Sequence, residues 1–456
     1  MAKPQTSGAA RKAVREGPDS PRAWYLGVFC TLYAFFGWVG LSSTPVLYVG
    51  LIKHSGASRE AASQPFTAMM CAYFMGSVLY GGLAQWLNEQ KLLFAAALII
   101  SSTLFASYFI VDITLLTVVL GVLHGLGVAS VGVVVGALLS QYFIKYRATA
   151  FALMSVTLSL TGVVFPPGGV LLRHRVRLLD VAAAAGRPVA APVPLLPAPG
   201  TAAVAARAGT AAAAAARYAD RPQDSRGAGK YKWSHREARQ HKTKYSQKHT
   251  YIMRPFVQGI FPICCTTNAC GCFAIFTYTL TIVDFAHDCG FQGYQAAMLM
   301  TAMSVGWAAA SVALAPAVDA GLTSKETVVF TSFVVQGIGF VFMAVLGEHY
   351  AWLVTGSVLV GWGQGSRGFL LFVFVPERFP KGQVPLAFAL MSLSCTLPFF
   401  ARAPIIGYVR DTLGSYFMLM VGLAAMQVVL AVCWGALALL KWRHRTAKLR
   451  IALPFA

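Results

Sequence analysis

The chain has 456 residues, of which 57% are hydrophobic and only 12% are charged, and its mean hydropathy is +0.62. This composition is far more apolar than that of a soluble protein of the same size, so the sequence is that of a membrane protein. The formal net charge is +21, but the positive residues gather in two tails and one long loop, which argues against nucleic-acid binding.

A helix needs about 20 mainly apolar residues to cross the hydrocarbon layer of a membrane. Eleven such windows follow one another along the chain, and each predicts a transmembrane helix. The windows are Trp24–Leu51, Phe66–Leu87, Leu92–Val111, Thr114–Leu139, Ala148–Leu172, Phe256–Phe285, Ala296–Val318, Val328–Leu346, Ala351–Val375, Val384–Val409 and Tyr416–Leu440.

The loops between these windows differ in charge. Lys91 and Lys145–Arg147 fall on the same side as the basic N-terminal tail, and Asp319–Lys325 and Glu377–Lys381 fall on the side of the basic C-terminal tail. The positive-inside rule therefore predicts that both termini are cytosolic. An even number of crossings must then separate the termini, so one span is missing from the eleven windows.

The missing span should lie in the Ala- and Pro-rich segment 173–216. Five prolines between Pro188 and Pro199 break any helix there, and Arg207 interrupts the alanine run that follows. Two interpretations stay open: a degenerate sixth span that is stabilised by its neighbours, or an artefact of the gene model.

These observations predict six regions along the chain. They are a cytosolic tail (1–22), an N-terminal helical bundle with spans one to five (23–172), the atypical segment in place of span six (173–216), a basic cytosolic loop (217–254), a C-terminal helical bundle with spans seven to twelve (255–440) and a cytosolic tail (441–456). The first region has no apolar core and is not predicted to be a cleaved signal peptide.

The hexapeptide AFALMS occurs twice, at Ala150–Ser155 and at Ala387–Ser392. Each copy follows a loop with basic residues, and a proline lies 12 residues beyond each copy, at Pro167 and Pro404. We interpret the repeat as a sign of two related halves, in which span five corresponds to span eleven.

Four stretches resemble the monocarboxylate transporter family, solute carrier family 16 of the major facilitator superfamily. They are PDSPRAW at Pro18–Trp24, SGASREAAS before the second span, the long stretch Gly121–Ser155, and PIIGYVRDTLGSY at the end of span eleven. The resemblance covers most of the chain except residues 173–254. It implies an all-α membrane protein of twelve helices in two six-helix halves, which alternately expose a central site to the two sides of the membrane.

The resemblance also marks departures. Proton-coupled members hold a lysine just past an aromatic residue in span one, and the aligned positions here are Ser42 and Trp38. Their span eight carries an aspartate and an arginine one turn apart, which align with Trp307 and Ser311. Trp38 and Ser42 are thus expected at the substrate site, but the proton-binding carboxylate is replaced, which argues against proton-coupled lactate transport.

Two arginines lie within predicted spans, Arg367 in GWGQGSRG and Arg402 in FFARAPIIG. A charged side chain at mid-span costs at least about 2.5–3.5 kcal/mol, so it should face a wet cavity or a partner. A guanidinium can bind a carboxylate through two hydrogen bonds, and Gln364 lies on the same helical face as Arg367. We predict that all three contact substrate. The alternative is that each arginine binds unpaired backbone carbonyls or extends to the membrane interface.

Other polar residues have weaker assignments. His124 in span four could bind substrate or a proton, or could simply form a hydrogen bond within the bundle. Lys145 and Arg147, at the cytosolic start of span five, are expected to act in gating or topology.

No hydrolytic triad, nucleotide-binding loop or metal constellation is recognisable, so an enzyme, a cofactor and a metal site are not predicted. The glycines of GWGQGSRG lie within a span and are expected to let helices approach closely. The cysteines between Cys264 and Cys272 lie in an apolar run without nearby His or carboxylate, which indicates buried thiols.

The prediction is a secondary transporter, by facilitated diffusion or symport, for a small organic anion or zwitterion at the plasma membrane. Alternatives are a carrier of neutral or aromatic amino-acid-like solutes without proton coupling, and a non-transporting receptor-like protein. Expected partners are the solute, a proton or other coupling ion, and membrane lipid. The resemblance also allows a single-span accessory glycoprotein, which some family members use.

Overall fold

The computed structural model describes residues 19–163, with gaps at 45–46, 49–50, 52–58, 108 and 111, and residues 260–452 except 292. Within these residues, ten helices are long and apolar enough to cross a membrane, and an eleventh apolar helix, Arg147–Val163, is shorter. Every secondary-structure element in the described ranges is helical. Each of the eleven predicted windows coincides with one of these helices, which confirms an all-α membrane fold.

The N-terminal half, residues 19–163, contains five crossings. They are α2 (Pro21–Ser42), α4 (Arg59–Leu83), α5 (Glu89–Ser107), a fourth crossing made of α6 (Ile113–Leu116), η1 (Thr117–Leu123), α7 (His124–Ser130), η2 (Val131–Val135) and α8 (Gly136–Tyr142), and the Arg147–Val163 helix. Two stretches of the fourth crossing, η1 and η2, are π-helical.

The C-terminal half, residues 260–452, contains six crossings. They are α12 (Phe261–Asp288), α13 (Tyr294–Asp319), α14 (Lys325–Leu346), α15 (Tyr350–Arg378), the eleventh crossing made of η3 (Lys381–Gln383), α16 (Val384–Leu393), α17 (Thr396–Phe400), α18 (Arg402–Gly407) and η4 (Tyr408–Thr412), and α19 (Phe417–Ala452). The atypical segment 173–216 and the basic loop 217–254 lie outside the described residues, so the predictions made for them stay predictions.

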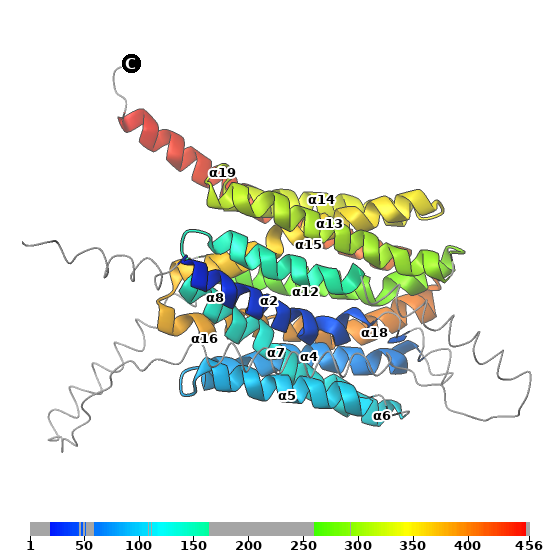
Figure 1. The fold of residues 1–456 in the computed structure, drawn as a ribbon. Coiled ribbons are helices and arrows are strands. Elements are labelled where there is room, and N and C mark those ends of the chain that lie inside the picture. Colours follow the sequence, from blue (N-terminus) through cyan, green and yellow to red (C-terminus); the bar gives the residue numbers. More distant parts are fainter. Residues whose placement is uncertain are drawn as a thin grey trace, which may run out of the picture.

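The crossings run along a common direction and separate into two groups (Figure 1). The early helices α4, α5 and α7 form one side of the bundle, and α13, α14, α15 and α19 form the other. Between them lie α2, α12 and α16. Helices from opposite ends of the sequence thus meet in the middle of the molecule, where α4 packs along α16, α17 and α18.

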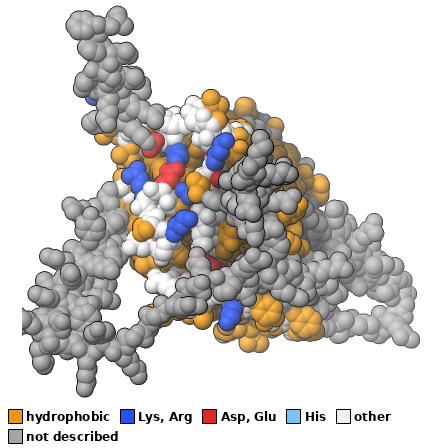
Figure 2. All heavy atoms as spheres, turned by 60° about the vertical axis from the view of Figure 1, so that its left-hand side comes forward, with side chains coloured by type: hydrophobic (Ala, Val, Ile, Leu, Met, Phe, Trp, Pro, Cys, Tyr) orange, Lys and Arg blue, Asp and Glu red, His pale blue; other side chains and the backbone are white. Residues whose placement is uncertain are grey.

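Basic residues collect at one end of the bundle. This end, called the basic end, carries Lys91, Lys145, Lys325, Arg378 and Lys381 on loops and helix termini. Figure 2 shows Lys and Arg side chains gathered there among polar residues, with apolar side chains along the flanks. This is the end that the loop charges predict to be cytosolic.

Glycines bring α13 and α15 into backbone contact. A Cβ atom built on Gly361 would lie 1.9 Å from the Met303 carbonyl oxygen, and one on Gly365 would lie 2.2 Å from the Trp307 carbonyl oxygen. No side chain fits at either position, which confirms that the glycines of this segment serve close helix packing. The contact also fixes the register of α15, the helix that carries Arg367.

Asp319 joins the two halves at the basic end. Its carboxylate accepts hydrogen bonds from the backbone nitrogens of Ala148 (3.1 Å) and Thr149 (2.8 Å) and from the Thr149 hydroxyl (2.7 Å). These nitrogens belong to the first turn of the Arg147–Val163 helix, where unpaired N–H groups favour an anion.

We expect Gly365→Ala to lower the midpoint of thermal unfolding of the detergent-solubilised protein. The new methyl group would overlap the Trp307 carbonyl and force α13 and α15 apart, and such overpacking costs about 1–3 kcal/mol. The matched control is Gly422→Ala in α19, where a Cβ atom meets nothing within 4 Å. Equal midpoints for the two variants would contradict the proposed packing role.

Candidate functional site

A cavity of about 90 Å³ lies where the two halves meet. Its lining comes from α2, α4, η2 and the Arg147–Val163 helix of the N-terminal half, and from α12, α13, α15 and α16 of the C-terminal half. Cavities between helix bundles are usual places for small-molecule sites. Among the described lining residues, Arg367 is the one whose side chain carries a charge at neutral pH.

Arg367 is buried, with 1% of its surface exposed, and its described partners are all neutral. One terminal nitrogen donates to Gln336 Oε1 (2.6 Å) and to Gln364 Oε1 (2.9 Å), and the other donates to the Gly363 carbonyl (3.4 Å). The guanidinium carbon lies 4.6 Å from the centre of the Phe333 ring. The positive charge is therefore solvated by amides and an aromatic face rather than by a carboxylate.

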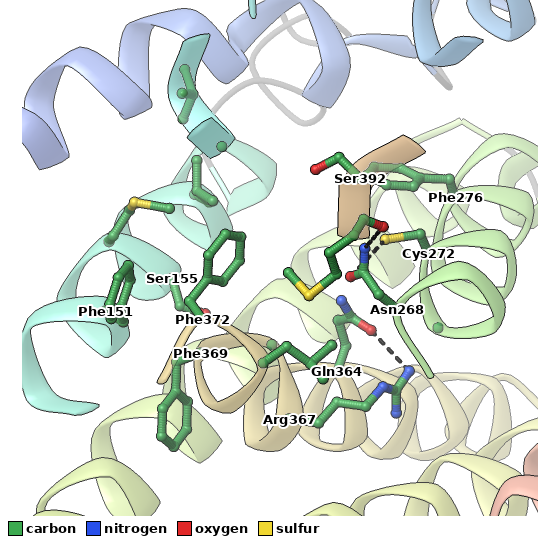
Figure 3. Close-up of a pocket in the computed structure, with 18 of the residues that line it drawn as sticks. Phe151, Ser155, Asn268, Cys272, Phe276, Gln364, Arg367, Phe369, Phe372 and Ser392 are labelled. Carbon is green, nitrogen blue, oxygen red and sulfur yellow. Dashed lines mark hydrogen bonds between the residues drawn. The ribbon is translucent and has the colours of Figure 1, made fainter. Parts of the chain in front are cut away.

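The polar wall of the cavity comes from α12 and α15. Figure 3 shows Asn268 and Cys272 on one helix near Gln364 and Arg367 on the other. Asn268 donates to the Met391 carbonyl (3.2 Å) and to Cys395 Sγ (3.1 Å). These bonds join α12 to the end of α16 and to the residue that precedes α17, and the amide of Asn268 lines the cavity.

The rest of the wall is largely aromatic. Trp38, Tyr73 and Phe276 line one part, and the Trp38 ring packs edge-on against Tyr73 at 5.6 Å between centroids. Phe369 and Phe372 line another part, on the side away from Asn268 in Figure 3. An apolar or aromatic portion of a solute would find complementary surface here.

The two copies of AFALMS contribute matching residues to the cavity. Met154 and Ser155 of the first copy and Met391 and Ser392 of the second all line it. This agreement supports the interpretation that spans five and eleven occupy related positions.

The phenylalanines of the two copies meet toward the basic end. Phe151 lies 6.4 Å from Phe388 between ring centroids, and both pack on Phe372, at 5.5 and 5.3 Å. This cluster, called the inner aromatic cluster, stands one helical turn from the first residues of both helices, between those residues and Ser155 and Ser392 of the cavity, and its Phe151 and Phe372 also line the cavity.

A chain of hydrogen bonds crosses the boundary between the halves beside the cavity. Trp307 Nε1 donates to Ser155 Oγ (2.7 Å), Ser155 and Ser311 share a hydrogen bond of 3.1 Å, and Ser311 donates to the Gly365 carbonyl (3.2 Å). Trp307 and Ser311 occupy the positions at which the resemblance expected an aspartate and an arginine. In the structure both side chains are instead hydrogen-bonded to the uncharged Ser155 of the N-terminal half.

Of the six predicted substrate-binding residues, three line the cavity: Trp38, Gln364 and Arg367. Gln364 also orients Arg367, as its place on the same helical face predicted. Ser42 does not line the cavity; its hydroxyl is hydrogen-bonded to Thr161. Ser42 lies one helical turn beyond Trp38 on α2, and the cavity lining on this helix includes Trp38 but not Ser42.

Arg402 is likewise buried away from the cavity. It donates to Thr67 Oγ1 (3.0 Å) on α4, and its guanidinium carbon lies 4.9 Å from the Phe399 ring centre. The hydrogen bond crosses from the C-terminal to the N-terminal half on the side opposite the basic end. The structure therefore places Arg402 between the halves and outside the cavity lining, so its predicted contact with substrate has no support from the cavity.

His124 is completely buried and lies outside the cavity lining. Its Nδ1 is hydrogen-bonded to Thr103 Oγ1 (3.2 Å), and its Nε2 faces Gly40, where a Cβ atom would be only 2.5 Å away. The imidazole thus fills the contact among α2, α5 and α7, which corresponds to the packing alternative for this residue.

Lys145 and Arg147 lie at the basic end, as predicted. Arg147 donates to the carbonyls of Phe143 (3.2 Å) and Ser140 (3.3 Å), and the Lys145 ammonium lies 5.2 Å from the Tyr146 ring centre. Arg147 thereby holds the end of α8 against the start of the next helix. Their gating role stays a prediction.

Sequence reasoning missed two polar residues of the site, Asn268 and Gln336. Asn268 lies in the cysteine-rich run that the sequence indicates as buried thiols, and Gln336 lies in the apolar window Val328–Leu346. A polar amide in the middle of a span is the signal that could have identified both.

We expect Phe388→Ala to speed reaction of Cys272, which lines the cavity, with a small thiol reagent. The substitution removes the ring contacts of Phe388 with Phe151 and Phe372, at about 0.5–1.5 kcal/mol each, so the population of openings toward the basic end should rise by about fivefold or more. Mass spectrometry of the Cys272 peptide measures the rate. The control is Phe342→Ala, which removes the ring contact of Phe342 with Trp352 (5.3 Å between centroids), two residues that do not line the cavity. A similar rate increase in both variants would contradict a role of the inner aromatic cluster in closing the cavity.

No protein-family model and no curated protein matches the sequence. Among solved structures, the chain is similar to the major facilitator superfamily proton:xylose symporter XylE bound to 6-bromo-6-deoxy-D-glucose. The two share 13% sequence identity and a TM-score of 0.63, and the match covers 90% of this chain and 94% of the symporter. The chain therefore has the fold of the major facilitator superfamily.

Proposed function

We propose that this protein is a secondary transporter that moves a small organic anion across a membrane by alternating access, with Arg367 as the anion-binding residue. The observation that carries the proposal is the buried guanidinium at the cavity between the halves, where all its described partners are neutral. A positive charge in such a place is stabilised further by a ligand that brings a negative charge.

The residues that line the cavity also favour an apolar or aromatic group on this anion. Trp38, Tyr73 and Phe276 offer aromatic faces, and Asn268 offers an amide. An aryl or branched apolar monocarboxylate, such as phenylpyruvate, fits this combination better than a highly hydroxylated solute would, because few polar side chains are available to replace its hydration.

An aromatic amino-acid-like solute is the second candidate. Its carboxylate would bind Arg367 as above, and its ammonium group would face the aromatic rings of Trp38 and Tyr73, which attract cations. The two candidates differ at the α-carbon, which carries a keto group in phenylpyruvate and an ammonium group in phenylalanine, so parallel uptake of the two solutes separates them.

The contacts between the halves support the transport cycle. On the basic end they comprise Asp319 with the first turn of the Arg147–Val163 helix and the inner aromatic cluster; on the opposite side they include Arg402 with Thr67. Exchange of one set for the other would expose the cavity to each side in turn. The charges of the basic end favour its placement in the cytosol, and we propose the plasma membrane as the site of action.

The test is uptake of labelled phenylpyruvate and phenylalanine into liposomes that contain the purified protein. We expect Arg367→Ala to lower uptake at low solute concentration by about tenfold or more, because it removes hydrogen bonds to a charged group. Lysine at this position should restore uptake only in part, since it lacks the planar fork of donors.

The matched control is Arg378→Ala, which removes an exposed arginine from the end of the same helix. Its uptake should equal that of the unmodified protein. Unchanged uptake in Arg367→Ala would overturn the assignment of the site. Repeating the measurement with and without a pH gradient distinguishes facilitated from proton-coupled transport.

A further inference from the structure

Arg367 has a hydrogen-bond partner that lies outside the cavity lining. Gln336 lies on α14, a helix that contributes no described residue to the cavity lining, and it is fully buried. It nevertheless makes the shortest hydrogen bond of the Arg367 guanidinium, at 2.6 Å.

The orientation of the Gln336 amide is determined by a second contact. Its nitrogen donates to the Val360 carbonyl on α15 (3.3 Å), so its oxygen is the atom that turns toward Arg367. Gly363 permits this approach, because a Cβ atom there would lie 2.6 Å from the Gln336 Cβ. Glutamine is thus held between two backbone segments with its acceptor aimed at the arginine.

The arginine keeps donors for a solute in this arrangement. Its described hydrogen bonds use three of the five N–H donors of a guanidinium, all of them directed to neutral acceptors. The Nε atom of Arg367 lies 3.0 Å from the position that a Cβ atom on Gly271 would take. Gly271 lines the cavity and has no side chain, so it leaves space beside this N–H donor.

We propose that Gln336 is a positioning residue that orients Arg367 without neutralising it, so that the cavity selects a solute with one net negative charge. This inference rests on the proposed function and specifies its substrate class by charge. A carboxylate at the same place would have similar shape and the same acceptor, but it would pair with the guanidinium and compete with the anionic solute. The amide supplies the acceptor and leaves the charge available.

The test compares two size-matched variants, Gln336→Glu and Gln336→Met, in binding to the purified full-length protein by calorimetry. The probes are phenylpyruvate and its uncharged primary amide. We expect the unmodified protein to bind the anion at least about tenfold more tightly than the amide. Gln336→Glu should abolish this preference, and Gln336→Met should weaken binding of the anion several-fold while leaving that of the amide unchanged.

A pH series separates positioning from packing. In Gln336→Glu, protonation of the introduced carboxyl group removes its negative charge, so affinity for phenylpyruvate should rise as the pH falls, whereas the unmodified protein and Gln336→Met should show no such rise. Gln427→Met, at another buried glutamine on α19, is the control for loss of a buried amide and should keep the charge preference.

The outcomes are distinguishable. The proposal is overturned if Gln336→Glu retains the tenfold preference at every pH, or if Gln336→Met weakens both probes equally. Either result leaves the proposed function intact when Arg367→Ala still loses uptake. If Gln336→Glu does not fold, the two probes with Gln336→Met decide alone. Absence of Arg367-dependent binding in the unmodified protein would instead refute the proposed function.

Discussion

A guanidinium that is buried between transmembrane helices has to be provided with acceptors by the protein, because the hydrocarbon around the bundle offers none. In this chain the requirement is met by Gln336, Gln364 and the Gly363 carbonyl, with the Phe333 ring beneath the charge. The solvation of this guanidinium depends on how three helices meet α15. α14 must present the Gln336 amide to α15, α13 must lie against α15 in one register, and α12 must leave room opposite Arg367. A glycine lies at each of these contacts: Gly363 against α14, Gly361 and Gly365 against α13, and Gly271 on α12 against Arg367.

The boundary between the halves has a different character. Its contacts are individually small: hydroxyl pairs, aromatic edges, one carboxylate on a helix start and one arginine on a threonine. Contacts of this kind contribute about 0.5–3 kcal/mol each, the charged ones most, so a few can be exchanged for others of similar energy. The groups that surround Arg367, namely Gln336, Gln364, the Gly363 carbonyl and the Phe333 ring, all belong to the C-terminal half, so they can keep their places when the halves move. A binding site that is stable and an interface that is adaptable can therefore coexist in one bundle.

The sequence predicted the helices well and the site in part. Hydropathy windows coincide with all eleven described crossings, because each crossing must be apolar along its whole length to lie in lipid. Of the residues predicted to bind substrate, Arg367, Gln364 and Trp38 line one cavity, and the first two are three residues apart on a helix; their contact with substrate stays a prediction. Arg402 satisfied the same sequence criterion as Arg367, yet its partner is Thr67, which is 335 residues away in the chain. Nothing local distinguishes an arginine that faces a cavity from one that faces a neighbouring helix.

The sequence by itself determined the membrane character, the order of the crossings, the basic end and the relation between the two AFALMS segments, since these follow from hydropathy, loop charge and repetition along the chain. Only the tertiary structure decided which polar residues share the cavity. It placed Ser42 and His124 in helix contacts, added Asn268, and revealed Gln336 behind Arg367. The physical reason is that a side chain's surroundings depend on how helices far apart in sequence pack together, and hydropathy describes each helix alone.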